Sequence, residues 1–218
     1  SVDAVTLSSI EFSTSFTIEF VIRLNNNSNY AGICSFRYGS GNEIVIDMYS
    51  TQKRLRFYMW SGGGSSAKFF SHTGGTHDGT LMTVDGSTYH HMVCVYNNST
   101  QQAEYYQDGV RVWYQTGISI SESNFPIVSS QTSAIGDINL GPFFNMKYFR
   151  IWNNRALSSS EITTLYNNQN TVYAANSWTL PIPHFKTANL SYDGNQALLV
   201  PYGICLLYTS PSPRDSTL

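Results

Sequence analysis

The stretch MKYFRIWNNRALSSSEITTLY, residues 146–166, decides the fold, because strand chemistry gives way to helix chemistry within it. Its first part is rich in aromatic and β-branched residues and ends at an Asn pair, a pattern that predicts a strand followed by a turn. Ser158 and Glu161 then have the spacing of a capping box, in which the hydroxyl accepts from an amide of the first turn and the carboxylate accepts from the cap amide. We therefore expect one short helix near residues 158–167.

The expected helix carries a narrow apolar stripe. Ile162, Leu165 and Tyr166 fall at positions i, i+3 and i+4, which lie on one face of a helix. A helix of about two turns is not stable alone in water. We therefore expect its apolar face to pack on a β-sheet.

The same segment resembles the closing motif of laminin G-like domains, which belong to the concanavalin A-like lectin/glucanase superfamily. The matching residues are FRIWNNRALS at 149–158 and the spaced pairs EI and LY at 161–166. A second motif of that family, a strand with a histidine and then a hairpin, is matched by YHHMV at 89–93 and YYQDG at 105–109. The resemblance covers residues 16–168.

The resemblance implies an all-β fold: a two-sheet antiparallel jelly-roll β-sandwich of the pentraxin-like kind, with the one short helix packed on it. It also implies that His91, which stands at the histidine of the motif, is hydrogen-bonded in the core. The sequence departs from the motif at Tyr89, where the family has Trp, and at Gln107, where it has an apolar residue. One fold hosts many functions, so the ligand does not follow from it.

Composition limits the classes of partner. Only 12% of the 218 residues are charged, against roughly 25% in an average soluble domain, and the formal net charge is −2. A nucleic-acid-binding surface needs a basic patch, and none is visible, so we expect no nucleic acid as a partner. No apolar run approaches the roughly 18 residues that span a bilayer, so we expect no membrane insertion.

The chain divides into three parts. We expect the β-sandwich over residues 1–170, then a final edge strand or a linker to a missing module over 171–204, where the periodicity is weak. Residues 205–215, CLLYTSPSPRD, resemble a translated sequencing adapter, so we interpret 205–218 as an artefact. We therefore expect the natural protein to be a longer polypeptide.

Alternation of apolar and other side chains marks one strand clearly. In residues 16–24 the apolar side chains take one face and Thr17, Glu19, Val21 and Arg23 the other, which predicts a half-buried strand. Further strands at even spacing, with turn signals between them, predict two packed sheets. Cys34 and Cys94 lie in apolar segments and could form either one disulfide or two buried free thiols.

The sequence offers little for catalysis. Glycosidases of this superfamily place carboxylates at alternate positions of one strand. Glu43 and Asp47 share a face here, but Val45 stands between them, so we expect a solvated strand face and no catalytic residues. A glycoside hydrolase or polysaccharide lyase of the same fold remains an alternative function.

Two metal sites can be considered. His72, His77 and Asp78 lie in one Gly-rich segment, with a spacing that matches no structural zinc pattern. Calcium is the better candidate, because laminin G-like and pentraxin-like domains often bind it at loop ends with carboxylates and carbonyls. Asp78, Asp85 and Asp137 are the residues that would hold it, and calcium is the only cofactor the sequence suggests.

The best ligand-binding candidates are Arg56, Tyr58 and Trp60, which share one face of the predicted strand at 54–60. Aromatic rings stack on sugar rings, and the guanidinium group donates to hydroxyls or carboxylates. Alternatively the helix or loops cover these side chains. We expect a non-catalytic module that binds a glycan or glycoprotein, within an extracellular or particle-surface protein. A third possibility is an adhesive or structural module that binds protein.

Overall fold

The computed structural model describes the strands and the helix of the chain. The described residues are 5–8, 12, 14–24, 31–38, 42–49, 54–61, 66–71, 75–77, 85–121, 133–135, 144–168, 187–189 and 196–199.

The first of two sheets contains the segment that carries the candidate ligand-binding residues. Its strands are β1 (Val5–Ser8), β3 (Ala31–Tyr38), β4 (Asn42–Tyr49), β5 (Arg54–Ser61), β6 (Ser66–Phe70), β11 (Ser133–Ile135) and β13 (Thr187–Asn189). Their order is β13-β1-β11-β3-β4-β5-β6. Neighbours pair antiparallel, except that β1 and β13 are parallel.

The second sheet contains both family motifs. Its strands are β2 (Phe16–Leu24), β7 (Thr76–His77), β8 (His90–Asn97), β9 (Gln102–Gln107), β10 (Val110–Gln115), β12 (Phe144–Asn153) and β14 (Gln196–Leu199). Their order is β14-β12-β2-β8-β9-β10-β7, and the neighbours pair antiparallel. β13 and β14, from the weakly periodic segment 171–204, are edge strands of the two sheets.

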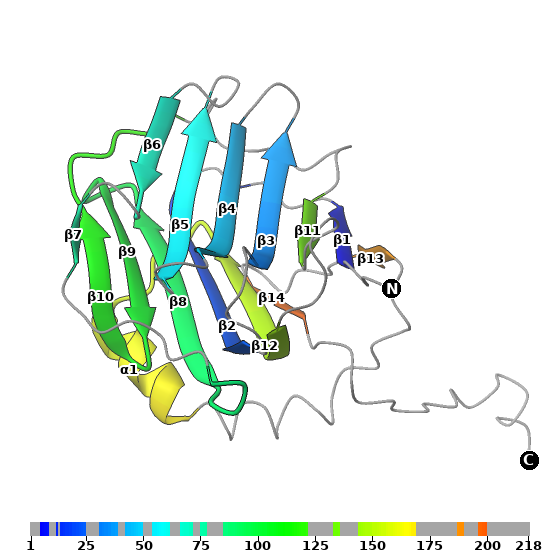
Figure 1. Cartoon of the computed structure of the whole chain (residues 1–218). Helices are drawn as coiled ribbons and strands as arrows, with labels where there is room; N and C mark the ends of the chain where they lie inside the picture. Colours follow the sequence, from blue (N-terminus) through cyan, green and yellow to red (C-terminus); the bar gives the residue numbers. More distant parts are fainter. Residues whose placement is uncertain are drawn as a thin grey trace, which may run out of the picture.

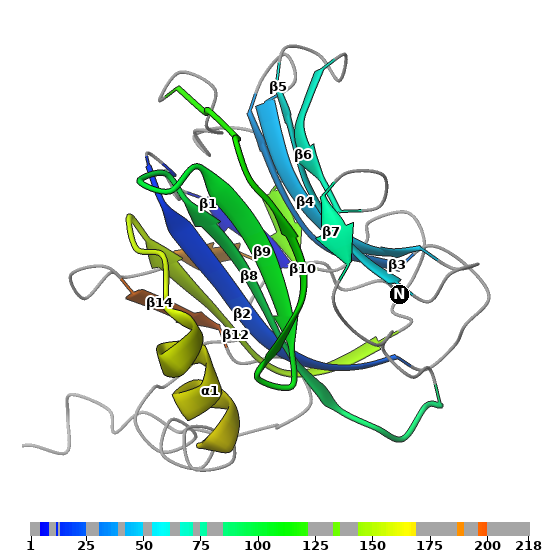
Figure 2. The same cartoon turned by 90° about the vertical axis from the view of Figure 1, so that its left-hand side faces the viewer.

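The two sheets form two facing layers (Figures 1 and 2). Aromatic side chains from both layers meet between them. Phe57 of the first sheet lies 6.1 Å from Phe16 and 6.5 Å from Trp113 of the second, measured between ring centroids and with edge-on geometry. Such contacts contribute to stability beyond the apolar area that they bury. The expected antiparallel jelly-roll β-sandwich is confirmed.

The single helix of the described chain, α1 (Ser159–Asn167), confirms the expectation from the capping box. Ser158 is its N-cap: the Ser158 hydroxyl accepts from the Glu161 amide, and the Glu161 carboxylate accepts from the Ser158 amide. Figure 2 shows α1 against the outer face of the second sheet. There Ile162 is fully buried in a cluster with Val93 and Trp152. Tertiary packing therefore holds a helix that is too short to persist alone.

The expectation that β2 is half-buried is wrong. Thr17, Glu19 and Val21, the residues expected to face solvent, are all fully buried. The turn before α1 covers part of this face, where the Thr17 hydroxyl donates to the Arg155 carbonyl and accepts from the Leu157 amide. Alternation indicated the two faces of the strand correctly, but not what covers the second one.

His91 lies in the interior, as the family motif implies. Its side chain is fully buried, and its Nε2 atom is 2.9 Å from the Glu19 carboxylate. Cys34 and Cys94 are both buried free thiols in the structure. Within the described residues, no helix is long and apolar enough to cross a membrane.

Candidate functional site

The outer face of the first sheet carries the candidate ligand-binding residues on β5. Leu55, Phe57 and Met59 point into the core and are at most 2% exposed. The alternate side chains Arg56 and Tyr58 are half-buried on the opposite side, as is Trp60. Because α1 packs on the other sheet, the helix does not cover these side chains.

Asp47 of the neighbouring strand β4 holds Arg56 in place. The register sets the two residues directly opposite one another. The Arg56 guanidinium donates to both carboxylate oxygens, with Nε 2.5 Å from Oδ1, and the two side chains are only 16% and 11% exposed. A bidentate pair of this kind fixes the plane of the guanidinium group. Asp47 was expected on a solvated strand face, and that expectation is wrong.

Tyr58 joins the same group. Its hydroxyl lies 3.4 Å from Oδ2 of Asp47 and donates to it. Burial, and next the negative charge of Asp47, raise the pKa of Tyr58 well above its ordinary value. The phenol therefore stays protonated and neutral over the whole physiological range, and remains a hydrogen-bond donor.

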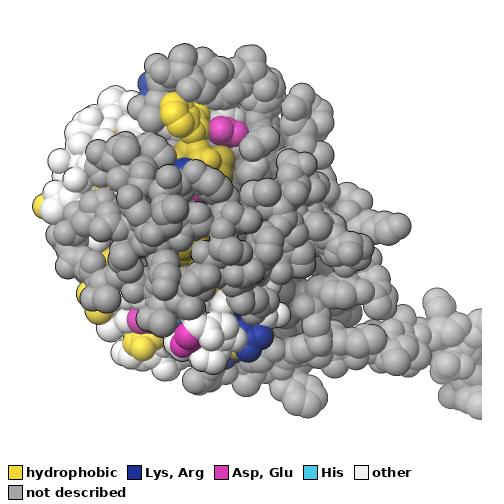
Figure 3. Space-filling model, viewed as in Figure 1, with side chains coloured by type: hydrophobic (Ala, Val, Ile, Leu, Met, Phe, Trp, Pro, Cys, Tyr) yellow, Lys and Arg dark blue, Asp and Glu magenta, His cyan; other side chains and the backbone are white. Residues whose placement is uncertain are grey.

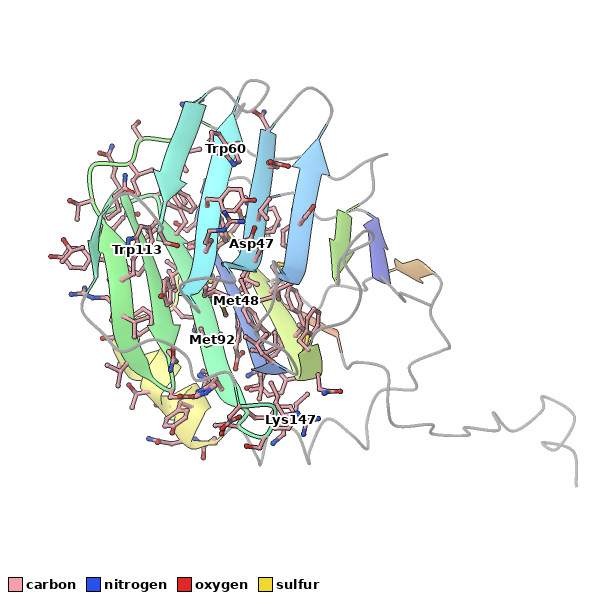
Figure 4. The ribbon with its side chains drawn as sticks, viewed as in Figure 1. Asp47, Met48, Trp60, Met92, Trp113 and Lys147 are labelled. Carbon is pink, nitrogen blue, oxygen red and sulfur yellow. The ribbon has the colours of Figure 1, made fainter. Side chains whose placement is uncertain are left out.

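Two aromatic rings continue this surface along β5. The Tyr58 and Trp60 rings meet edge to face, with centroids 6.0 Å apart and planes at 81°, and the Arg56 guanidinium lies 5.7 Å from the Tyr58 centroid. Figure 4 shows Asp47 and Trp60 on the neighbouring strands β4 and β5. In Figure 3 a hydrophobic patch, with basic and acidic side chains beside it, reaches the surface over these strands. We call Asp47, Arg56, Tyr58 and Trp60 the β4–β5 face.

The β4–β5 face does not resemble a pair of catalytic carboxylates. Val45 stands between Glu43 and Asp47 on β4 and is 6% exposed, while Glu43 lies opposite Trp60 rather than another acid. Both oxygens of Asp47 already accept from Arg56. Glycoside hydrolysis needs one carboxyl to donate a proton and a second to act as nucleophile or base. The described part of this face offers no such pair.

Asp85 is the one expected calcium ligand that the structure describes. Its exposed carboxylate accepts from the amides of Ser87 at 2.8 Å and Thr88 at 2.7 Å, and from the Thr88 hydroxyl. These bonds, that of the Thr88 hydroxyl foremost, lower the pKa of Asp85 below its ordinary value. Asp78 and Asp137 lie outside the described residues.

The histidine-rich cluster is likewise only partly described. His77 is the last residue of the short strand β7, at the edge of the second sheet, whereas His72 and Asp78 lie outside the described residues. Among the residues that the structure describes, no three His, Cys, Asp or Glu side chains form a metal-binding group.

Sequence reasoning identified three members of the β4–β5 face and missed the fourth. Asp47 was missed because its place depends on how β4 pairs with β5. In that antiparallel pair, Asp47 and Arg56 have opposite charges and lie directly opposite each other. The closeness of the two strands along the sequence could have suggested this pairing, but it does not specify the register.

A family model described as the concanavalin A-like lectin/glucanases superfamily matches residues 1–163. A search of curated protein sequences found no match.

Solved structures share the fold at low sequence identity. The binding domain of botulinum neurotoxin DC in complex with rat synaptotagmin II has a TM-score of 0.51 and 17% identity, over 72% of this chain and 36% of that one. A heptameric SAP-like pentraxin from Limulus polyphemus has a TM-score of 0.51 and 13% identity, over 91% and 84%. Trypanosoma rangeli sialidase has a TM-score of 0.50 and 16% identity, over 73% and 23%.

These likenesses establish the fold and not the ligand. The chain spans only about a third of the toxin binding domain, at 36% of its length. The three structures include the binding domain of a neurotoxin and a sialidase, so the fold alone does not choose between a binding module and an enzyme.

Proposed function

The chain belongs to the concanavalin A-like lectin/glucanases superfamily, and from this premise we propose that it is a non-catalytic carbohydrate-binding module whose ligand lies on the β4–β5 face. The observation that carries the proposal is the edge-to-face pair of Tyr58 and Trp60, half-exposed on the outer side of the sheet. Large aromatic side chains on the outer face of a strand leave apolar surface in contact with water, which is unfavourable. A role in ligand binding explains their presence on this face.

The chemistry of this face suits a saccharide. The rings offer apolar surface for the C–H face of a sugar ring, and the tyrosine hydroxyl offers a polar edge. Asp47 holds the Arg56 guanidinium beside Tyr58, so the polar part of the face is ordered before a ligand arrives. Preorganisation of this kind lowers the entropic cost of binding.

The rest of the proposal concerns context. We place the module in a longer extracellular or particle-surface protein, with a glycan or glycoprotein as its partner. Calcium belongs to the proposal through Asp85, together with Asp78 and Asp137. The Asp85 carboxylate stays ionised at neutral pH, which suits a hard cation.

The test is a glycan array probed with the full chain, in calcium and again in chelator. Y58A and W60A should each weaken binding of the glycans that the wild type binds by roughly two- to tenfold in affinity, because an aromatic contact contributes roughly 0.5–1.5 kcal/mol. Y114A is the matched control. Tyr114 is a half-buried tyrosine on β10 in the other sheet, stacked with Arg111 at 4.2 Å.

The outcomes separate the alternatives. Loss of signal in chelator would support the calcium part of the proposal, and an unchanged signal would exclude it for that glycan. Signal that survives in Y58A and W60A would place the ligand elsewhere. If the wild type binds no glycan in either condition, the recognition of protein partners becomes the leading hypothesis. Release of reducing sugar from a bound glycan would instead support the glycoside hydrolase alternative.

A further inference from the structure

A second polar–aromatic cluster lies on the outer face of the second sheet, where β12, β2 and β8 come together. Arg23, near the end of β2, pairs with Asn145 of β12. On the other side, the pairing of Ile22 with His90 brings Tyr89 alongside Arg23. In the view of Figure 4, Lys147 lies at the opposite end of the molecule from Trp60, so this cluster is separate from the β4–β5 face.

A β-bulge places Lys147 in this cluster. The register of β12 against β2 shifts between Met146 and Tyr148, so Lys147 is the extra residue of the bulged strand. A bulge interrupts the regular hydrogen bonding between two strands and changes the direction of a side chain. Bulges are over-represented next to functional sites. Here the redirected group is an ammonium, which lies 4.5 Å from the centroid of the Tyr89 ring.

Two positive charges share that ring. The Arg23 guanidinium lies 5.1 Å from the Tyr89 centroid, in addition to the Lys147 ammonium. All three side chains are half-exposed. In Figure 3, basic side chains reach the surface at the lower edge of the molecule, with white atoms between them and a neighbouring acidic side chain.

Within the described chain, no carboxylate neutralises these charges. Neither Arg23 nor Lys147 forms an ion pair there, and the buried Nε atom of Arg23 has no hydrogen-bond acceptor. Glu19, the acid on the same face of β2, is bound by Arg150. Asp85, close to Tyr89 in sequence, accepts from Ser87 and Thr88. Arg23 and Lys147 are therefore two neighbouring cations without an acidic partner among the described residues, and their half-exposed side chains can be reached by an anion from solution.

We propose that Arg23, Lys147 and Tyr89 form a second ligand site, which binds the oxyanion group, sulfate or carboxylate, of an acidic saccharide. The ammonium and the guanidinium donate charge-assisted hydrogen bonds to the oxyanion, and the ring of Tyr89 holds both cations on one side of the sheet. An anion placed between them also relieves the repulsion of the two like charges. This site lies on the other sheet from the β4–β5 face and does not depend on it.

The experiment compares neutral lactose with two acidic probes built on it: sulfated lactose, which adds a sulfate group, and sialyllactose, which adds a sialic acid residue with its carboxylate. The full chain labelled with ¹⁵N is titrated with each probe, and the dissociation constant is measured from amide chemical shifts. We expect sulfated lactose or sialyllactose to shift the amides of Arg23, Tyr89 and Lys147, while lactose leaves them unmoved. K147Q should weaken that binding about fivefold, the size of one half-exposed charge pair.

Matched variants make the result specific. R111Q removes another arginine of the same sheet, which also lies over a tyrosine ring but is paired with Glu104 at 3.0 Å, and it should leave the affinity unchanged. R23Q should weaken binding as K147Q does. If R23Q does not fold, K147Q still decides, because its side chain is half-exposed in a bulge.

Several outcomes would overturn the proposal. The first is that neither acidic probe shifts the amides of Arg23, Tyr89 and Lys147. The second is equal affinity in K147Q and the wild type. The third is an equal loss in R111Q, which would indicate attraction to general charge. The two acidic probes separate sulfate from carboxylate as the group recognised. Y58A, measured in the same titration, should keep the oxyanion-dependent shifts, so failure of the β4–β5 face and failure of this site are distinguishable.

Discussion

The buried carboxylate of Glu19 on β2 joins three strands of the second sheet, because its partners lie on β8 and β12. Its oxygens accept from Arg150 Nε at 2.7 Å and Nη2 at 2.8 Å and from the Tyr148 hydroxyl at 2.8 Å, and His91 lies 2.9 Å away. Burial by itself raises the pKa of Glu19, but the His91 hydrogen bond and the Arg150 charge outweigh it and lower the pKa overall. The carboxylate is therefore ionised in the folded protein and fully compensated.

We expect E19Q to lower the free energy of unfolding by about 3–5 kcal/mol, because it leaves the Arg150 charge buried without its partner. Urea titration followed by tryptophan fluorescence measures this. R155Q is the control: Arg155 pairs with Glu161 on the surface, where the side chains are 52% and 41% exposed, and its loss should cost under about 1 kcal/mol. Equal effects of the two changes would contradict the role assigned to Glu19.

The same carboxylate makes stability depend on pH in the acid range. The pKa of Glu19 is lower in the folded protein than its ordinary value of 4.5, so its contribution is present above that pH and is lost as pH falls through the folded pKa. The unfolding free energy of the wild type should therefore decrease as pH falls below about 4.5. The decrease should be smaller in E19Q. Parallel curves for the two proteins would assign the acid sensitivity to other groups.

At the level of single elements, α1 illustrates how local and tertiary forces combine. The capping box satisfies its first amides, and the described last turn carries no basic residue to balance the helix dipole. Its hold on the sheet comes from one fully buried side chain, Ile162, and its partners. The N-cap and this packing therefore both contribute to the stability of the short helix.

S158A should destabilise the protein by about 1 kcal/mol, the usual cost of losing an N-cap hydroxyl. Thermal unfolding monitored by circular dichroism is the measurement. S159A serves as the control, because Ser159 is one position farther on and is exposed, so its loss should change stability little. S158T should keep most of the stability, since threonine also caps. A larger effect of S159A than of S158A would contradict the assigned cap.

The β-bulge at Lys147 is an element-level feature that the sequence did not predict. The residues around it read as an ordinary strand, and nothing in their composition marks an extra residue. The bulge exists only relative to β2, because it is a mismatch between two registers. Functional proposals that depend on it, such as the oxyanion site, could not have come from the sequence.

At the scale of the whole molecule, the two sheets must separate before a reagent from solution can reach the buried core. Cys34 of the first sheet and Cys94 of the second are both buried free thiols, and burial, before any other cause, raises the pKa of each. Thiolates are the reactive form of cysteine. Both residues should therefore resist alkylation until the sandwich opens.

We expect C205S, which lacks the third cysteine of the sequence, to react with Ellman's reagent only at the rate of unfolding. Urea should raise that rate in step with unfolding measured by fluorescence. Fast reaction of both thiols under native conditions would contradict a closed sandwich. Reaction of a single thiol would show that one layer opens without the other.

The sequence by itself determined what depends on near neighbours along the chain. The capping box of α1, the two faces of β5 and the antiparallel sandwich all follow from spacings of two to four residues and from short motifs. The sequence predicted that Arg56, Tyr58 and Trp60 share one face of β5. Successive side chains of a strand alternate between its two faces, whichever strand pairs with it.

Only the tertiary structure decided which distant residues meet and which faces are covered. Arg150 binds Glu19 across 131 positions of sequence, and this contact turned an expected solvent face of β2 into a buried one. The register of β4 against β5 placed Asp47 on Arg56, and the bulge in β12 placed Lys147 beside Tyr89. Strand order and register arise from the packing of the whole core, and a shift of one residue would exchange every face, so local sequence cannot specify them.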